Sequence, residues 1–431
     1  MIRTHQAINK LLLYRDQYFI NKKTAAIAAS LGRLSEKWLE PNYIWRRRAI
    51  AELVKSSRFS HSMSHALLDS IFKELTRVKL KKLLCSELGD IRALDGFFFK
   101  PVLGHRLFGI GPMLITHVFA ANLPNPAVSS LVHGLLVKSA GAVKVSSRDA
   151  GILPIYLESL KKHDPALSKV NILLPAQDRA GLREWVAASE VVVAYGNEKT
   201  IQTFWKMTGP RKKFVGYGHR VSFSLYTREA LTQKGALDLA RRTARDIWMG
   251  DQRGCLSPAV IYVEAGAAVT GLDFAKEVAK ALGDLSGEGN GLPPAKTQRI
   301  LDKEELKNRW RLKKAKGEEV CFWESPKPGE WAVFFEKKNQ EFSISCAGQT
   351  VFVREYQNLD DVYRALKSYQ KYLQGVALEA GKAKREKISL ALSRLGVNRI
   401  TRAGKLQEPP FGWRHDGMSP IAGWLRWTGL E

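Results

Sequence analysis

The sequence predicts two α/β domains, with a helical segment before them and an irregular tail after them. The chain has 431 residues, 45% of them hydrophobic, which exceeds the usual size of one domain and is enough to bury more than one core. From about residue 112 onward, short apolar runs alternate with amphipathic stretches. Strands that alternate with helices over this length indicate a mainly parallel sheet with helices on both faces.

The first domain is expected to follow a run of helices. Residues 1–90 carry apolar side chains at helical spacing with little alternation, which predicts helices. Beyond them we expect strands at 113–121, 142–145, 170–174, 191–194 and 213–215, and helices at 126–136, 152–160, 179–188 and 199–205. Such sheets place ligands at the carboxyl ends of their strands.

The second domain is expected to run from about residue 216 to about 392, so that the first domain covers 1–215. Its expected strands are 221–225, 259–264, 320–323, 331–335, 342–346 and 350–353, and its expected helices are 228–249, 273–282, 303–316 and 359–375. Glycines and prolines predict a loop over 283–294. Residues 393–431 are rich in Trp, Gly and Pro and predict an irregular tail that packs back on the body.

The charge balance is strongly basic, with 68 Lys and Arg against 42 Asp and Glu, a net charge of +26. Such a surface attracts anions of any kind. The basic residues are spread along the chain, without a zinc finger, an RNP-type aromatic strand or a leucine-zipper basic region, so we expect no specific nucleic-acid partner. A phosphorylated substrate, an anionic membrane face in peripheral contact and a generally basic surface all stay open as interpretations.

The sequence predicts a cytoplasmic protein. Charged residues interrupt the apolar positions of residues 1–30, whereas a secretory leader needs an uninterrupted apolar stretch. No apolar run is long enough to cross a bilayer.

Cysteine is scarce, and one of the four cysteines stands out. Cys85, Cys255, Cys321 and Cys346 form no Cys-x-x-Cys pair and have no histidine at metal-ligand spacing, so neither a disulfide scaffold nor a metal site is expected. Cys255 occupies a glycine-flanked turn between a long helix and a buried strand. Such a turn can expose the sulfur next to backbone N–H groups, which lower a thiol pKa and can hold an oxyanion. The alternative is a buried structural cysteine, the interpretation we favour for the other three.

Four segments resemble the aldehyde dehydrogenase superfamily, and specifically its LuxC branch of fatty acyl-CoA reductases. Residues 251–258, Asp-Gln-Arg-Gly-Cys-Leu-Ser-Pro, resemble the Gly-Gln-x-Cys nucleophile turn. Residues 117–124 resemble the strand that ends in an Asn-x-Pro turn, and residues 142–147 the Val-Lys-x-Ser strand end. Residues 406–417 resemble the carboxyl-terminal segment. The resemblance implies an aldehyde dehydrogenase-like fold, with a dinucleotide-binding domain over 1–215 and a catalytic domain over 216–392.

The resemblance also implies two catalytic roles. Cys255 would attack an acyl thioester, release CoA and remain as an acyl-enzyme. Asn122 would donate its side-chain amide, together with the Cys255 backbone N–H, to the oxygen that gains charge in the tetrahedral intermediate. Asn122 can also be a simple turn asparagine before Leu-Pro.

Cofactor roles follow in the same way. Lys144 would hydrogen-bond the adenosine ribose from a strand end, and Ser147 and Arg148 lie where a 2′-phosphate would be met, which favours NADPH over NADH. Gly196 would occupy the turn before the helix that abuts the pyrophosphate, because helix N-termini bind such groups readily. A solvated lysine and an ordinary turn glycine are the alternatives.

One segment bears on the direction of the reaction. Residues 215–220, Val-Gly-Tyr-Gly-His-Arg, lack a carboxylate, whereas oxidising aldehyde dehydrogenases carry there the base that activates water. Without that base, reduction of the thioester is favoured over hydrolysis. His219 would protonate the departing thiolate or the nascent alkoxide, or else serve packing or bind the cofactor. The spacing leaves the roles of His415 and Asp416 open.

We therefore expect a reductase that converts an acyl-CoA, with a fatty acyl group implied by the resemblance, to the aldehyde with NADPH. Reduction of an acyl phosphate or an acyl-carrier-protein thioester is the alternative among enzymes. A non-catalytic basic binding protein on the same fold is the alternative outside them. The resemblance further implies a homo-oligomer, and a partner comparable to the acyl-activating synthetase or thioesterase that accompanies such reductases in luminescent bacteria.

Overall fold

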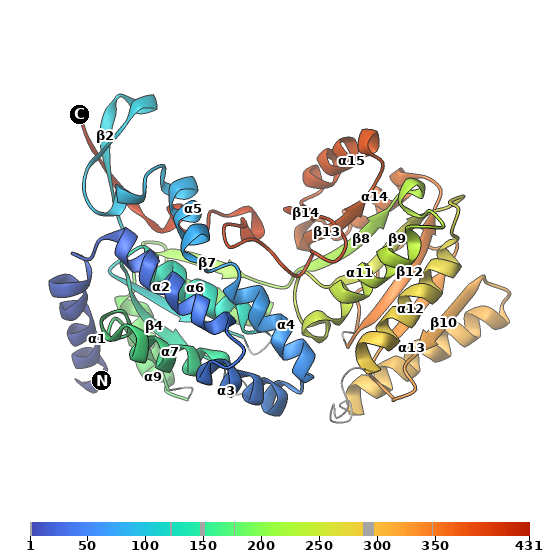
Figure 1. Cartoon of the computed structure of the whole chain (residues 1–431), viewed down its shortest axis with the longest axis horizontal. Helices are drawn as coiled ribbons and strands as arrows, with labels where there is room; N and C mark the ends of the chain where they lie inside the picture. The colour runs from blue at the N-terminus through green and yellow to red at the C-terminus, as the bar shows by residue number, and fades with distance from the viewer. Residues whose placement is uncertain (1, 121–122, 147–150, 176, 288–296, 347) are drawn as a thin grey trace. The chain divides into compact units, whose positions relative to one another are not determined.

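The computed structural model describes residues 2–120, 123–146, 151–175, 177–287, 297–346 and 348–431. The chain forms two compact units (Figure 1). Unit 1 comprises Met1–Arg58, Ser64–His219 and Pro410–Glu431, and unit 2 comprises Phe59–Met63 and Arg220–Pro409. The carboxyl-terminal segment is thus shared between the two units.

Unit 1 is built on a five-stranded parallel sheet. In spatial order the strands are β5 (Asn171–Leu173), β4 (Ala140–Lys144), β3 (Leu114–Val118), β6 (Val191–Tyr195) and β7 (Lys213–Tyr217). The chain starts in the middle at β3, moves outward to β5, and then adds β6 and β7 on the other side. The carboxyl ends of β3 and β6 therefore flank the point where the connections diverge, which is where open α/β sheets bind ligands. All five strands were expected from the sequence and are confirmed.

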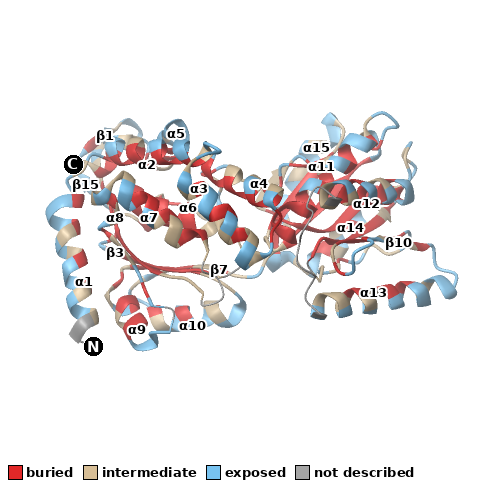
Figure 2. Cartoon of the chain, turned by 60° about the horizontal axis from the view of Figure 1, so that its bottom comes forward, coloured by how far each residue is buried: buried red, intermediate tan, exposed pale blue. Residues whose placement is uncertain are grey.

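Helices cover both faces of this sheet (Figure 2). On one face lie α9 (Arg179–Ala188) and α10 (Glu198–Thr208), and on the other α6 (Asn125–Leu136) and α7 (Ile152–His163), which is followed by the short α8 (Pro165–Ser168). Because the sheet is covered on both faces, its central strand β3 is buried at every position, including the polar Thr116 and His117.

The expected amino-terminal helices are confirmed. They are α1 (Ile2–Tyr14), α2 (Thr24–Leu39), α3 (Ile44–Glu52), α4 (His61–Phe72) and α5 (Arg77–Leu88). Trp38 of α2 is fully buried and stacks on Phe72 of α4, with 4.5 Å between ring centroids. Its indole N–H donates to Ser159 Oγ of α7 at 3.0 Å. The amino-terminal helices thus share the core of unit 1.

A separate three-stranded antiparallel sheet joins two distant segments of unit 1. Its order is β1 (Phe98–Lys100), β2 (His105–Ile110) and β15 (Arg426–Leu430). The sequence predicted no strand here, and the irregular tail expected over 393–431 is wrong at this point, because its last residues form a ladder with β2. Nothing in the local pattern announces that pairing, since the two partners lie far apart in the chain.

Unit 2 contains a seven-stranded sheet in which only the edge strand β10 is antiparallel. Its order is β10 (Val320–Glu324), β11 (Ala332–Glu336), β12 (Thr350–Tyr356), β9 (Pro258–Glu264), β8 (Val221–Tyr226), β13 (Leu373–Glu379) and β14 (Arg399–Thr401). The helices are α11 (Ala236–Trp248), α12 (Gly271–Gly287), α13 (Thr297–Ala315), α14 (Leu359–Lys367) and α15 (Lys382–Arg394).

Two helical layers bury the seven-stranded sheet. Helices α13, α14 and α15 contribute Trp310, Leu366 and Leu392 to one apolar cluster with strand residues such as Phe223 and Phe334. Helices α11 and α12 pack side by side as the other layer (Figure 1). Among the described helices, none combines the length and the apolarity needed to span a membrane.

Three expectations for unit 2 were wrong in detail. Residues 342–346 form no strand, because Ser345 directs its hydroxyl to the backbone of Thr350 and to the side chain of Gln252. The helix expected over 359–375 ends at Lys367, and the chain then forms the fully buried β13. The helix expected over 228–249 begins only at Ala236.

Candidate active site

Cys255 lies directly before β9, at the amino end of that strand. Strands β12, β9 and β8 are parallel, so this edge of the sheet gathers amino ends. The described candidate residues of unit 1, Lys144 and Gly196, lie at or after the carboxyl ends of their strands, where the sequence predicted ligands.

The backbone before Cys255 adopts an uncommon conformation. Gly250, Asp251 and Gln252 all have left-handed φ angles, of 66°, 54° and 56°. A side chain in this region is sterically disfavoured, and such conformations persist only where the surroundings hold them. The loop must therefore be fixed by specific contacts.

The Gln252 side chain supplies most of those contacts. Its amide nitrogen donates to Pro258 O at 2.9 Å and to Thr350 O at 2.7 Å. Its amide oxygen accepts from Thr350 N at 2.8 Å and from Ser345 Oγ at 3.0 Å. One buried amide thus ties the strained loop to the starts of two neighbouring strands, β9 and β12.

Asp251 anchors the same loop through charge. Its carboxylate is 5% exposed and pairs with Arg299 of α13 at 2.5 Å and with Arg253 at 3.1 Å. The second carboxylate oxygen accepts from Gln349 Nε2 at 3.3 Å. Because a buried carboxylate needs such partners, the two arginines and Gln349 hold the Asp251 side chain inward.

Cys255 itself sits in a tight turn that is fixed on both sides. The N–H of Ser257 donates to Gly254 O at 3.1 Å and closes the turn. The carbonyl of Cys255 accepts from Ser222 Oγ at 2.7 Å, and that hydroxyl oxygen accepts from Gly375 N at 3.0 Å. The backbone that carries the thiol is therefore locked, while the residue stays partly exposed.

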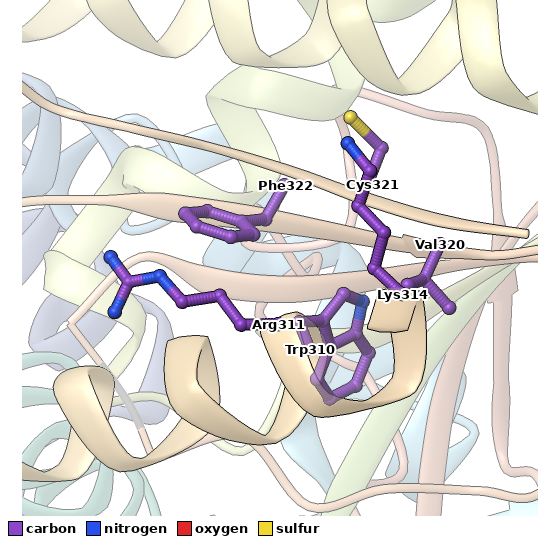
Figure 3. A pocket seen from close by; sticks show the side chains of 6 residues that line it. All are labelled: Trp310, Arg311, Lys314, Val320, Cys321 and Phe322. Carbon is purple, nitrogen blue, oxygen red and sulfur yellow. The ribbon is translucent and has the colours of Figure 1, made fainter. Parts of the chain in front are cut away.

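Exposure alone does not distinguish Cys255. None of the four cysteines, all of which the structure describes, is joined in a disulfide, and all are partly exposed, so the buried structural interpretation of the other three is wrong as to burial. Cys321 lines a cavity of about 110 Å³ between α13 and β10 (Figure 3). The first residue of β10 pairs with the last residue of β11, so this cavity lies at the edge of the sheet opposite Cys255. What sets Cys255 apart is the turn that carries it.

Lys144 ends β4 at the carboxyl edge of the unit 1 sheet. Its side chain is half-buried, and desolvation lowers the pKa of its ammonium group below the ordinary value. The side-chain ammonium of Lys144 forms no hydrogen bond or ion pair with any residue that the structure describes. A partly desolvated ammonium without a partner suits a ligand hydroxyl or phosphate, so this residue fits the role of holding a dinucleotide.

Gly196 follows β6 at the same edge. Its N–H donates to Tyr217 O at 3.1 Å, and an added Cβ would lie 2.8 Å from the Thr200 side chain. Only glycine therefore lets α10 begin this close to the strand. The helix is capped by Asn197, whose side chain accepts from Thr200 N at 2.9 Å, and Glu198 in the first turn opposes an anion there.

Three other predicted residues cannot be placed. Asn122 falls within 121–122, and Ser147 and Arg148 fall within 147–150, all outside the described residues. His219 is described; it lies two residues beyond the end of β7 and is exposed. Across the described ranges, no group of three or more His, Cys, Asp or Glu side chains is arranged to hold a metal ion.

The sequence did not reveal a stack of rings on this edge of unit 1. Tyr195 ends β6 and stacks on Tyr217 at the end of β7, with 4.5 Å between centroids. His415 stacks on Tyr217 at 4.2 Å, and Trp413 stacks on His415 at 4.7 Å. The tail segment thus covers the carboxyl ends of two strands. In the sequence, the aromatic residues around His415 were the signal from which this contact could have been predicted.

The ring stack also brings the carboxylate of Asp416 close to Tyr217, in the segment 215–220 that contains no Asp or Glu. Asp416 follows His415, and their side chains approach to 3.7 Å. Burial, and then the charge of Asp416, raise the pKa of the Tyr217 phenol well above its usual range. The absence of Asp and Glu from 215–220 therefore does not mean that this part of the fold is free of carboxylates.

Together, the two helix-covered sheets and the turn that carries Cys255 form a two-unit α/β architecture of the aldehyde dehydrogenase-like fold class. Solved structures agree in fold. The NAD-dependent benzaldehyde dehydrogenase of Corynebacterium glutamicum superposes with a TM-score of 0.70 at 15% identity, covering 99% of this chain and 90% of that one. Aldehyde dehydrogenase 21 of Physcomitrella patens, in complex with the reaction product succinate, gives 0.69 at 13% identity, covering 98% and 89%.

Within that class, the chain belongs to the LuxC family, described as acyl-CoA reductase, whose profile matches residues 20–427. Similar relatives are the long-chain acyl-protein thioester reductases of Vibrio harveyi and Aliivibrio fischeri. The first is 23% identical over 404 residues, covering 92% of this chain and 80% of the relative. The second is 22% identical over 437 residues, covering 99% and 86%. The family and the fold class expected from the sequence are confirmed.

Proposed function

We propose that this protein reduces an acyl thioester to an aldehyde through an acyl group held on Cys255. The observation that carries the proposal is the turn itself, in which a partly exposed cysteine follows a strained loop fixed by Gln252 and Asp251. Strain held by many contacts is typical of functional sites. Membership of the LuxC family supports the same chemistry.

In the first step the Cys255 thiolate attacks the carbonyl carbon of the thioester. The bond from this carbon to the leaving sulfur breaks, and the leaving thiolate takes up a proton. The backbone N–H of Cys255 and the amide of Asn122 are proposed to stabilise the oxyanion. His219 is proposed as the proton donor, in keeping with its exposed place after β7.

A reduced nicotinamide, when bound, supplies the hydride that turns the acyl group on Cys255 into an aldehyde. Lys144 is the described residue best suited to hold such a cofactor, because its half-buried ammonium has no partner among the described residues. NADPH is proposed in preference to NADH, with Ser147 and Arg148 as the residues that would meet the 2′-phosphate.

The proposed substrate is an acyl-CoA with a fatty acyl chain. Two similar relatives are named for long-chain acyl-protein thioesters, so an acyl group carried by a protein is the second candidate. The attack by Cys255 is the same for any good leaving group, and the carrier therefore has to be identified by experiment.

Intact-mass measurement after adding acyl-CoA without cofactor tests the proposal. We expect a mass increase equal to the acyl group, absent in Cys255→Ala and retained in Cys321→Ala, the matched control for a partly exposed thiol remote from the turn. NADPH should then discharge the adduct with release of aldehyde. An unchanged mass at every chain length, with acyl-CoA and with acylated carrier protein, would refute the proposal.

A further inference from the structure

Residues 403–409 of unit 2 form a short segment that we call the strap. Backbone N–H groups of the strap donate hydrogen bonds to a side chain of α11. The carboxylate of Asp246 in α11 is 1% exposed. Its two oxygens accept from Gly404 N at 2.7 Å and from Leu406 N at 3.0 Å. One buried carboxylate thus fixes the backbone of the strap immediately before Gln407.

A second acid holds the start of the strap. Glu379 Oε1 accepts from Ala403 N at 3.1 Å and from Arg242 Nη1 at 2.7 Å. Gly404 has a left-handed φ of 80°, and an added Cβ would lie 3.1 Å from the Arg242 side chain. The backbone of the strap is therefore held rigidly against α11.

The Gln407 side chain extends from the strap to the nucleophile turn. Its amide nitrogen donates to Ser257 Oγ and to the backbone oxygen of Asp246, the latter at 3.2 Å. Both Gln407 and Ser257 are buried, at 8% and 7% exposure. Ser257 is the residue whose N–H closes the turn around Cys255.

We infer that Gln407 is a positioning residue for Cys255, which acts through Ser257 and is itself aligned by Asp246. The turn is held at the Cys255 carbonyl by Ser222 and at the Ser257 hydroxyl by Gln407. Both N–H groups of a primary amide can donate at once, so this side chain can hold the turn and the end of α11 together. The inference rests on the proposed role of Cys255 as nucleophile.

The test compares three variants with one control on the strap. Gln407→Met keeps the side-chain length and removes the amide. Ser257→Ala removes the hydroxyl oxygen that accepts the hydrogen bond from that amide. Asp246→Asn places an amide against the strap N–H groups. Lys405→Ala is the control, because Lys405 is exposed on the strap and its ammonium pairs with Glu408.

The acylation rate of Cys255 is measured by rapid mixing with acyl-CoA and intact-mass detection. We expect Gln407→Met and Ser257→Ala each to slow acylation by at least about tenfold, because small displacements of a reacting group cost that much or more. The acyl-CoA concentration that gives half the maximal rate should stay within about twofold, since substrate binding is untouched. Asp246→Asn should show the same split, and Lys405→Ala should match the wild type.

A double-mutant cycle separates positioning from general loss of structure. If Gln407 acts through Ser257, the double variant Gln407→Met/Ser257→Ala should be no slower than the worse single variant, whereas independent effects multiply. Wild-type rates in both single variants, or multiplying effects, would overturn the inference. Equal acyl labelling of wild type and Cys255→Ala would instead refute the proposed function, so the two failures are distinguishable.

Discussion

At the scale of single residues, the turn that carries Cys255 is braced by the side chain of Gln252. Its amide uses two donors and one oxygen to hold two strand starts and a strained loop. The sequence offered this residue only as part of a motif. Its function as a brace is visible once the starts of β9 and β12 are known to lie side by side.

Gln252→Glu should therefore inactivate the protein, although the glutamate side chain has the same size as the glutamine that it replaces. The substitution removes both donors and buries a charge, so two backbone oxygens lose their partners at a cost of several kcal/mol. We expect the melting temperature to fall by at least about 5 °C and the alkylation of Cys255 by iodoacetamide to slow. Gln370→Glu, the same change at an exposed glutamine, is the control, and equal behaviour of the two variants would contradict the assignment.

Lys144 gives a prediction for cofactor binding. Loss of a hydrogen bond from a charged donor costs about 1.5–3 kcal/mol, so Lys144→Met should weaken NADPH binding by at least about tenfold, measured by nicotinamide fluorescence. Acylation of Cys255 without cofactor should be unchanged. Lys162→Met, at an exposed lysine in the last turn of α7, should bind NADPH normally. If both variants bind it equally well, Lys144 holds no part of the cofactor.

At the scale of elements, the local residue pattern predicted each strand of the five-stranded sheet of unit 1 but missed strand β13 of unit 2. Residues 359–375 look helical throughout, yet β13 begins at Leu373. The strand lies between β8 and β14 and is fully buried, and a run buried on both faces lacks the alternation that identifies an exposed strand. Its neighbours, which decide its conformation, are distant in sequence.

The junction of α11 with the strap predicts a pH dependence of stability. Burial raises the pKa of the Asp246 carboxyl from 3.8 to about 7, against the lowering effect of the backbone hydrogen bonds from the strap. Since the folded state binds this proton more tightly than the unfolded state, the stabilisation is complete below about pH 4 and is lost as the pH rises to 7.

The Asp246→Asn variant isolates that contribution. The size of the pKa shift corresponds to about 4 kcal/mol at most, so between pH 5 and pH 8 the wild type should lose more unfolding free energy than Asp246→Asn does. Denaturant titrations at the two pH values measure the difference. Parallel behaviour of the two proteins would show that Asp246 stays ionised across this range.

At the scale of the whole molecule, the net charge of +26 predicts how binding responds to salt. A phosphorylated substrate is attracted by the summed field, which salt screens over about 10 Å at 0.1 M. The KM for acyl-CoA should therefore rise several-fold between low and high salt, with little change in kcat. An acyl-pantetheine, which lacks the phosphates, is the control and should keep its KM; a similar rise for both substrates would rule out electrostatic attraction as the cause.

The amino-acid sequence by itself determined the alternation of strands and helices and the turn that carries Cys255. Both are written in the spacing of neighbouring side chains, and the motif around Cys255 is contiguous. Only the tertiary structure decided how that turn is held and what covers the edge of the unit 1 sheet. Gln407 reaches Ser257, and His415 stacks on Tyr217, across long stretches of intervening chain. Contacts of this kind arise when the chain folds back on itself, so no local pattern of residues contains them.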